Sequence, residues 1–173
     1  MSHGADPLIL TLGFDPAAFA VLDGLRRAHF PAHLNFIPAH LTLFHHLPGE
    51  RLAEVSDEVA REAASTPAFA VQVEGLRKLG RGVALTIGSR ELIALRARLA
   101  QVFADDLTPQ DRQGFRPHVT IQNKVAPDAA NALFERMSER FTPWTARAEA
   151  LLLWHYRQGL WEAAGRYNLE RSA

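Results

Sequence analysis

The chain has 173 residues, no cysteine, and 19 basic side chains against 19 acidic ones. This length fits one domain, and the lack of thiols excludes disulfide frameworks, thiolate metal sites and cysteine nucleophiles. The balanced charge argues against a protein that tracks a long duplex, because such proteins carry a basic excess to neutralise many phosphates. No extended duplex is therefore expected as a partner.

The N-terminal residues do not resemble a targeting segment. They read Met-Ser-His-Gly-Ala-Asp-Pro and lack the basic and then apolar layout of a signal peptide. No apolar run approaches the roughly 18 residues that a membrane-spanning helix needs. We therefore expect a cytoplasmic monomer without membrane contact.

The first third of the chain predicts a strand, a helix and a second strand. A short apolar run at 8–14, bounded by turn residues, is typical of a buried strand. Asp15 can act as an N-cap and Pro16 suits the first helical position, so a helix is expected over 16–29. After a loop, a half-buried strand is expected over 40–47.

The middle of the chain predicts a helix, a hairpin and another helix. Apolar residues at helical spacing indicate an amphipathic helix over about 52–64. Two strands, 69–79 and 83–87, flank a glycine-containing turn and are typical of a hairpin. Helical spacing then returns up to about residue 103, with Ser89 as the expected N-cap.

The last third repeats the same order of elements. A polar loop at 105–116 leads into a strand at 118–125, and a helix is expected over 127–140. Two further strands, 146–156 and 160–169, predict a second hairpin.

This repetition predicts an internal duplication. The expected fold is α+β and bilobal, with two antiparallel sheets whose outer helices flank a central cleft. Residues 1–173 would form a single two-lobed domain, with lobe one at about 15–88 and lobe two at about 89–173. The strand at 8–14 would be added to the sheet. Because no linker rich in Gly or Ser separates the halves, the lobes are expected to pack tightly.

Each half contains one copy of the same short motif. The copies are His40-Leu41-Thr42-Leu43 and His118-Val119-Thr120-Ile121. In a strand the apolar residues would face the core, and His and Thr would share the opposite face about 7 Å apart. Chance predicts about 0.08 such copies in a chain of this composition, so two copies indicate a function.

The paired motif suits chemistry at phosphorus. If a pseudo-two-fold axis relates the lobes, His40 and His118 approach one point from opposite sides, as in-line displacement requires. One imidazole can then take a proton from the nucleophile while the other protonates the leaving oxygen. The hydroxyls of Thr42 and Thr120 can donate hydrogen bonds to the non-bridging oxygens. No metal or other cofactor is needed for these steps.

These segments resemble the two-histidine phosphoesterase superfamily, whose bacterial members are called 2′-5′ RNA ligase-like or cyclic phosphodiesterase-like proteins. Its hallmark is two His-x-Thr/Ser motifs, one per lobe, each followed by an apolar residue. The resemblance covers nearly the whole chain. It implies metal-independent hydrolysis of 2′,3′-cyclic phosphates or 2′-5′ phosphodiesters in RNA ends or small nucleotides, and reversal would give 2′-5′ RNA ligation without ATP. A role in RNA processing is implied in the same way.

Further side chains are candidates for substrate contacts. Phe44 follows the first motif and could stack on a base, or belong to the core. Lys124 and Tyr156 could contact phosphate, or face solvent. The tryptophans are expected to pack, with a base pocket as the alternative. A metal site at His40, His45 and His46 is disfavoured, because strand alternation points His45 away from the other two.

Two other functions compete with catalysis. The cleft could bind a nucleotide or an RNA end without turning it over, although binding alone does not need two titratable imidazoles. A structural duplication with incidental histidines would bind nothing. The sequence also leaves open which histidine is the acid and which is the base, because the symmetry permits either.

Overall fold

The structure is a computed structural model that describes residues 4–171. Its strands are β1 (Leu8–Phe14), β2 (Thr42–Leu47), β3 (Phe69–Lys78), β4 (Val83–Gly88), β5 (His118–Gln122), β6 (Trp144–Arg157) and β7 (Leu160–Asn168). Its α-helices are α1 (Pro16–His29), α2 (Leu52–Ser65), α3 (Arg90–Val102), α4 (Pro109–Arg112) and α5 (Pro127–Arg140). Single 3-10 turns lie at Ala32–Leu34, Gly49–Arg51 and Ala104–Asp106.

Local signals explain where the helices start. The Asp15 carboxylate accepts a hydrogen bond from Ala18 N at 3.0 Å, and Pro16 opens α1 as expected. The Ser89 hydroxyl likewise accepts from Leu92 N at 3.1 Å at the start of α3. The prediction of a loop over 105–116 is wrong in one respect, because this segment contains the short helix α4. Four residues are too few to show a helical period in the sequence.

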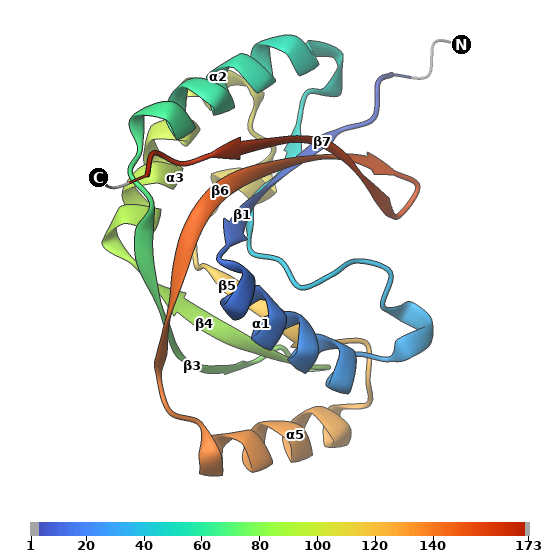
Figure 1. Cartoon of the computed structure of the whole chain (residues 1–173). Coiled ribbons are helices and arrows are strands. Elements are labelled where there is room, and N and C mark those ends of the chain that lie inside the picture. Colours follow the sequence, from blue (N-terminus) through green and yellow to red (C-terminus); the bar gives the residue numbers. More distant parts are fainter. Residues whose placement is uncertain (1–3, 172–173) are drawn as a thin grey trace.

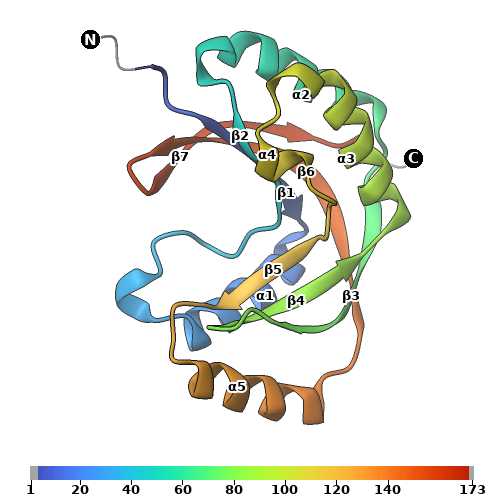
Figure 2. The ribbon, with the colours of Figure 1, turned by 180° about the vertical axis from the view of Figure 1, so that it is seen from behind.

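All seven strands join one antiparallel sheet. Its order is β2-β1-β6-β3-β4-β5, and β7 pairs with β6 beside this path. Figures 1 and 2 show that the sheet is strongly curled. The α+β class is confirmed, but the expected two separate sheets are continuous, because β6 belongs to both groups of strands.

The long strand β6 is the centre of the sheet. Along one edge it pairs first with β3, over Trp144–Ala148, and then with β7, over Ala150–Arg157. Along the opposite edge, residues 148–155 pair with β1. Because β3 and β7 follow one another along the same edge of β6, they cannot both extend one flat sheet. The sheet therefore divides and curls at β6. The two motif-bearing strands, β2 and β5, lie at the ends of the strand order.

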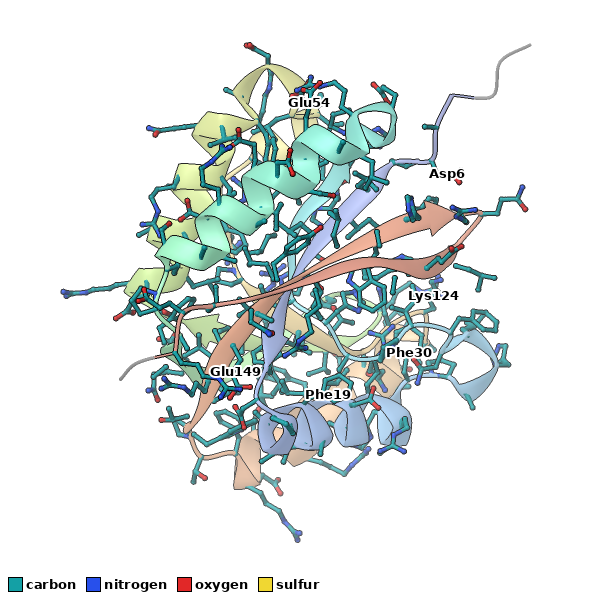
Figure 3. The ribbon with its side chains drawn as sticks, turned by 45° about the horizontal axis from the view of Figure 1, so that its top comes forward. Asp6, Phe19, Phe30, Glu54, Lys124 and Glu149 are labelled. Carbon is teal, nitrogen blue, oxygen red and sulfur yellow. The ribbon has the colours of Figure 1, made fainter. Side chains whose placement is uncertain are left out.

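The helices gather at two ends of the molecule. In Figure 1, α2 and α3 lie at one end, and α1 and α5 lie at the other. Contacts place α2 against β6 and β7, α5 against β3 and β4, and α1 against β5. Figure 3 shows Glu54 on α2 and Phe19 on α1 at these opposite ends.

One hydrophobic core connects these layers. It includes Leu10 from β1, Val55 from α2, Leu85 from β4 and Leu133 from α5. Strand pairing also crosses the expected lobe boundary, because β4 pairs with β5. An internal duplication of the chain, divided near residue 88, stays a prediction. Among residues 4–171, no helix is both long and apolar enough to cross a membrane.

The two motif strands differ in regularity. In β5, Val119 and Ile121 are buried while His118 and Thr120 are half-exposed, as alternation predicts. In β2, two register shifts against β1 interrupt the alternation, so that Leu43 and Phe44 are both buried.

Of the two alternatives for Phe44, base stacking or a place in the core, the structure shows the core. Its side chain is fully buried. Its ring meets that of Phe103 edge-on at 5.9 Å and lies 4.1 Å from the Arg96 guanidinium carbon. A base cannot reach a ring enclosed in this way.

Replacing Phe44 tests this assignment. We expect Phe44→Ala to lower the free energy of unfolding by about 3–5 kcal/mol, because it leaves a cavity in a packed core. The control Phe36→Ala, which truncates a ring that is 68% exposed, should change it by less than about 0.5 kcal/mol. Urea unfolding measures both values. Equal small changes in the two variants would contradict the burial of Phe44.

Candidate active site

Both motif histidines are held in the same way. His40 Nδ1 lies 2.8 Å from Pro38 O, and His118 Nδ1 lies 2.9 Å from Arg116 O. A carbonyl oxygen can only accept a hydrogen bond, so Nδ1 carries the proton in both rings. In the neutral imidazole, Nε2 is then the nitrogen with a free lone pair. Both rings are thus prepared to accept a proton through Nε2.

A polar hollow brings residues of both motifs together. Thr42 from β2 and His118 from β5 line this hollow, whose volume is about 440 Å³. His45, Arg77 and Arg116 line it as well. The curl of the sheet has therefore brought the two motif strands to one place. The side chains present can hydrogen-bond and neutralise an anion such as phosphate.

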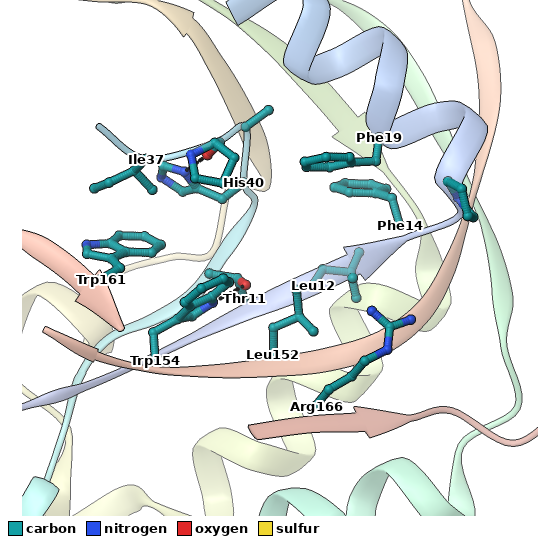
Figure 4. Close-up of a pocket in the computed structure, with 14 residues that line it drawn as sticks. Thr11, Leu12, Phe14, Phe19, Ile37, His40, Leu152, Trp154, Trp161 and Arg166 are labelled. Atoms are coloured by element: carbon teal, nitrogen blue, oxygen red, sulfur yellow. Dashed lines mark hydrogen bonds between the residues drawn. The ribbon is translucent and has the colours of Figure 1, made fainter. Parts of the chain in front are cut away.

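His40 lines a second, apolar hollow of about 320 Å³. Figure 4 shows His40, Trp154 and Trp161 on one side of this hollow and Phe14 with Phe19 on the other. The rings of Trp161 and His40 are 4.6 Å apart and inclined at 53°. Trp154 and Trp161 thus line a pocket, which was the alternative to simple packing that the sequence left open. The flat ring of a ligand could bind between these aromatic groups.

Trp154 and the rim of the apolar hollow add polar groups. Trp154 Nε1 donates to the Thr11 hydroxyl at 3.0 Å, which fixes the indole against β1. Arg166 of β7 contributes a guanidinium group to the lining of the same hollow. This polar rim can orient a ligand whose body is apolar.

The two histidines have lowered pKa values. Burial is the largest cause at His40 and lowers its pKa to about 4; the Pro38 carbonyl raises it, while the charges of Arg26, His118 and His45 lower it further. At His118 burial again lowers the pKa most, and Arg77 and His45 act in the same direction. Because the charges of His118 and His45 act at His40, the three imidazoles lie within electrostatic reach of one another.

A buried arginine from α1 connects the two motif regions. Arg26 Nη1 donates to Thr120 O at 2.9 Å, and Arg26 Nε donates to Asn35 Oδ1 at 2.9 Å in the loop before the first motif. From the same helix, Asp23 Oδ1 accepts a hydrogen bond from Ala39 N at 2.9 Å, next to His40. Helix α1 therefore positions His40 and β5 together.

A second buried arginine, from α3, positions β2 by connecting it to α4. Arg96 Nε donates to Leu43 O at 2.9 Å, and Arg96 Nη2 donates to Asp111 O at 2.6 Å. Sequence reasoning missed Arg26 and Arg96. The signal was present, because each guanidinium falls on the apolar face of an amphipathic helix, where Leu92, Leu95 and Leu99 surround Arg96.

The expected orientation of His45 is wrong. Regular alternation predicted that it points away from the motif face, but it lines the polar hollow together with Thr42. The register shifts in β2 cause this change, since they place Leu43 and Phe44 in the core and turn the following residue outward. Its ring contacts Asp111, which sequence reasoning also missed.

The remaining predicted residues lie elsewhere. Thr120 is half-buried on β5 next to Ile121. Lys124 is exposed and has φ 63°, which ends the strand before it and places it in a loop instead of on the strand. Tyr156 is 40% exposed on β6 opposite Trp161. The lining of the two hollows includes none of Thr120, Lys124 and Tyr156.

Metal ligands do not gather in the part of the chain that the structure describes. Within residues 4–171, no group of three or more His, Asp or Glu side chains is placed to hold a metal ion.

Known proteins share this architecture. A sequence model of the 2′-5′ RNA ligase superfamily matches residues 14–160. E. coli LigT complexed with 3′-AMP is similar with a TM-score of 0.62 and 20% identity, covering 95% of this chain and 98% of that one. TT0787 of Thermus thermophilus has a TM-score of 0.66 and 16% identity, covering 96% and 100%. The two structures confirm the fold. None of the curated proteins matches this chain.

The environment of His40 predicts an unusual titration. We expect its imidazole to titrate at pH about 4, and Trp161→Ala to raise this pKa toward the ordinary value of about 6.5 by admitting water. The control Trp144→Ala, on the part of β6 that pairs with β3, should leave it unchanged. NMR titration of the ring resonances measures each value.

The same shift predicts a dependence of stability on pH. Because the folded-state pKa of His40 lies below its unfolded-state value, the unfolded chain binds the proton first. Stability is fully present above pH about 6.5 and is lost as the pH falls toward about 4. Urea unfolding at several pH values measures the free energy of unfolding across this interval. In His40→Asn this free energy should change less with pH than in the unaltered protein. An equal change with pH in both proteins would contradict the lowered pKa.

Proposed function

Because the chain belongs to the 2′-5′ RNA ligase superfamily, we propose that it is a metal-independent phosphoesterase of RNA ends or small nucleotides. Its substrates are 2′,3′-cyclic phosphates or 2′-5′ phosphodiesters, and the reverse reaction is 2′-5′ ligation without ATP. His40 and His118 form the acid–base pair. The matching hydrogen bonds from their Nδ1 atoms to the carbonyls of Pro38 and Arg116 carry this proposal.

The two hollows divide the substrate between them. The polar hollow takes the phosphate, because Thr42 and His118 share it with Arg77 and Arg116. The apolar hollow on the other side of the first motif takes the base, with Trp161 beside His40. Stacking of a base on an aromatic side chain contributes about 1–3 kcal/mol. E. coli LigT, a protein of the same fold, is complexed with a nucleotide, 3′-AMP.

The chemical step needs one neutral and one charged imidazole. His40 has the more strongly lowered pKa and is neutral at pH 7, so its Nε2 is assigned as the base that takes a proton from water. The water oxygen then bonds to phosphorus while the bond from phosphorus to the 3′-oxygen breaks. His118 gives its proton to that oxygen, which leaves a 2′-phosphate. Thr42, which lines the polar hollow, stabilises the non-bridging oxygens, and Thr120, on the same strand as His118, is the second candidate for this role.

Substrate binding supplies the charge on His118. In the free protein, burial and the nearby Arg77 lower the pKa of His118. A bound phosphate brings negative charge next to the ring and favours its protonated form. The acid is thus charged when substrate is present. In the ligation direction the two histidines exchange roles.

Single substitutions of the two histidines test the proposal. We expect His40→Ala and His118→Ala each to reduce turnover of a 2′,3′-cyclic nucleotide by at least about 10², because each removes one proton transfer. The control His33→Ala changes an exposed histidine in a 3-10 turn and should retain activity. Far-UV circular dichroism checks that all variants fold. Full activity in the double variant would end the proposal.

Metal independence and turnover are measured together. Activity on cyclic nucleotides and 2′-5′ dinucleotides should persist in excess EDTA, because the proposed steps use only side chains of the chain. The pH profile of kcat/KM should be bell-shaped, since it needs one neutral and one protonated imidazole. Tight binding of a nucleoside 2′-phosphate without turnover of any of these substrates would favour the alternative of a non-catalytic binding module.

A further inference from the structure

A second histidine, besides His118, lines the polar hollow and is held by a buried carboxylate. His45 Nδ1 is 3.0 Å from Asp111 Oδ1. The backbone N–H of His45 donates to both carboxylate oxygens, at 2.9 and 3.0 Å, and that of His46 donates to Oδ2 at 3.0 Å. The Asp111 side chain is 1% exposed, whereas that of His45 is 46% exposed. One partner is thus fixed inside the protein while the other faces the hollow.

Asp111 is held as a carboxylate that can orient the ring. Burial alone would raise its pKa, but the hydrogen bonds from the His45 ring and from the backbone of His45 and His46 lower it below the ordinary value. A carboxylate only accepts hydrogen bonds, so Nδ1 of His45 must carry a proton. The remaining polar atom of this ring is Nε2. A carboxylate that fixes Nδ1 in this way sets the tautomer and the direction of Nε2.

The position of His45 relates it to the other two histidines. It shares the hollow with Thr42 and His118. Its positive charge lowers the pKa of both His40 and His118. His45 therefore lies within electrostatic reach of both members of the acid–base pair. Under the proposed function, the reacting phosphate binds in the hollow that His45 shares with Thr42 and His118.

The other charges facing this hollow are mostly positive. Arg77 comes from β3, Arg96 from α3 and Arg116 from the segment before β5. Asp111 is the carboxylate among the residues that line it, and its oxygens are occupied by His45 and His46. The hollow therefore favours an anion over a cation. His45, which lines this hollow, therefore fits an anion site.

We propose that His45 is a third substrate-contacting histidine, whose Nε2 donates a hydrogen bond to a non-bridging oxygen of the reacting phosphate. Asp111 is its positioning residue. The carboxylate at one ring nitrogen and the phosphoryl oxygen at the other both accept hydrogen bonds, so the ring donates from both nitrogens. The inference rests on the proposed function, because that function places the phosphate in this hollow.

The substitution His45→Asn tests this role. Asparagine keeps a short polar side chain near Asp111 but has no atom in place of Nε2. We expect kcat/KM for a 2′,3′-cyclic mononucleotide to fall about 10- to 100-fold, as for removal of a hydrogen bond to a charged group. Affinity for inorganic phosphate, measured by calorimetry, should fall about tenfold or more. The matched control His46→Asn changes the exposed neighbour and should affect neither value.

A measurement on the unaltered protein does not depend on the folding of a variant. Titration with inorganic phosphate should shift the ring nitrogen resonances of His45 together with those of His118 in long-range ¹H–¹⁵N NMR spectra. The resonances of exposed His33 should stay in place and serve as the internal reference.

The outcomes separate this inference from the proposed function. The role of His45 would be overturned if His45→Asn kept turnover and phosphate affinity within twofold of the unaltered protein, or if the His45 ring resonances did not move. Neither result would contradict the acid–base roles of His40 and His118. The protein could instead bind phosphate through His45 and turn over none of the cyclic or 2′-5′ substrates. That result would support His45 as a phosphate ligand and contradict the proposed phosphoesterase activity.

Discussion

The site depends on a single long strand that serves two groups of strands. Because β6 pairs with β3 along its first residues and with β7 along its last, the sheet has to divide and curl at this strand. The curl brings the two ends of the strand order, β2 and β5, to one polar hollow. A flat sheet in this order would keep its edge strands at maximum separation. The geometry of the candidate active site is thus a consequence of backbone pairing far from the histidines.

Edge strands brought together in this way leave backbone carbonyls without strand partners, and two buried arginines satisfy them. Arg26 donates to Thr120 O on β5, and Arg96 donates to Leu43 O on β2. Burial lowers the pKa of both guanidinium groups, which marks the cost of removing them from water. Hydrogen bonds and contacts with aromatic rings, Phe30 for Arg26 and Phe44 for Arg96, offset that cost. The motifs are therefore fixed by helices that carry none of the motif residues.

The same enclosure sets the electrostatics of the site. Burial keeps His40 and His118 neutral, and the surrounding positive charges add to this effect. The free site thus contains two bases and an excess of cationic groups, and a bound anion would change the balance toward one protonated imidazole. Under the proposed function, binding of the substrate and protonation of the acid would then be the same event. The ring of Trp161, 4.6 Å from that of His40 at the apolar hollow, adds to the burial of the imidazole.

The sequence by itself determined the strands, the four longer α-helices, the α+β class and the paired motif, because these follow from local patterns. Capping residues such as Asp15 and Ser89 act within one turn, and alternation in β5 places His118 and Thr120 on one face. The tertiary structure decided the rest. The register shifts that bury Phe44 and turn His45 into the hollow arise from pairing with β1. The role of Asp111 likewise depends on contacts between residues distant in sequence, which no periodicity records.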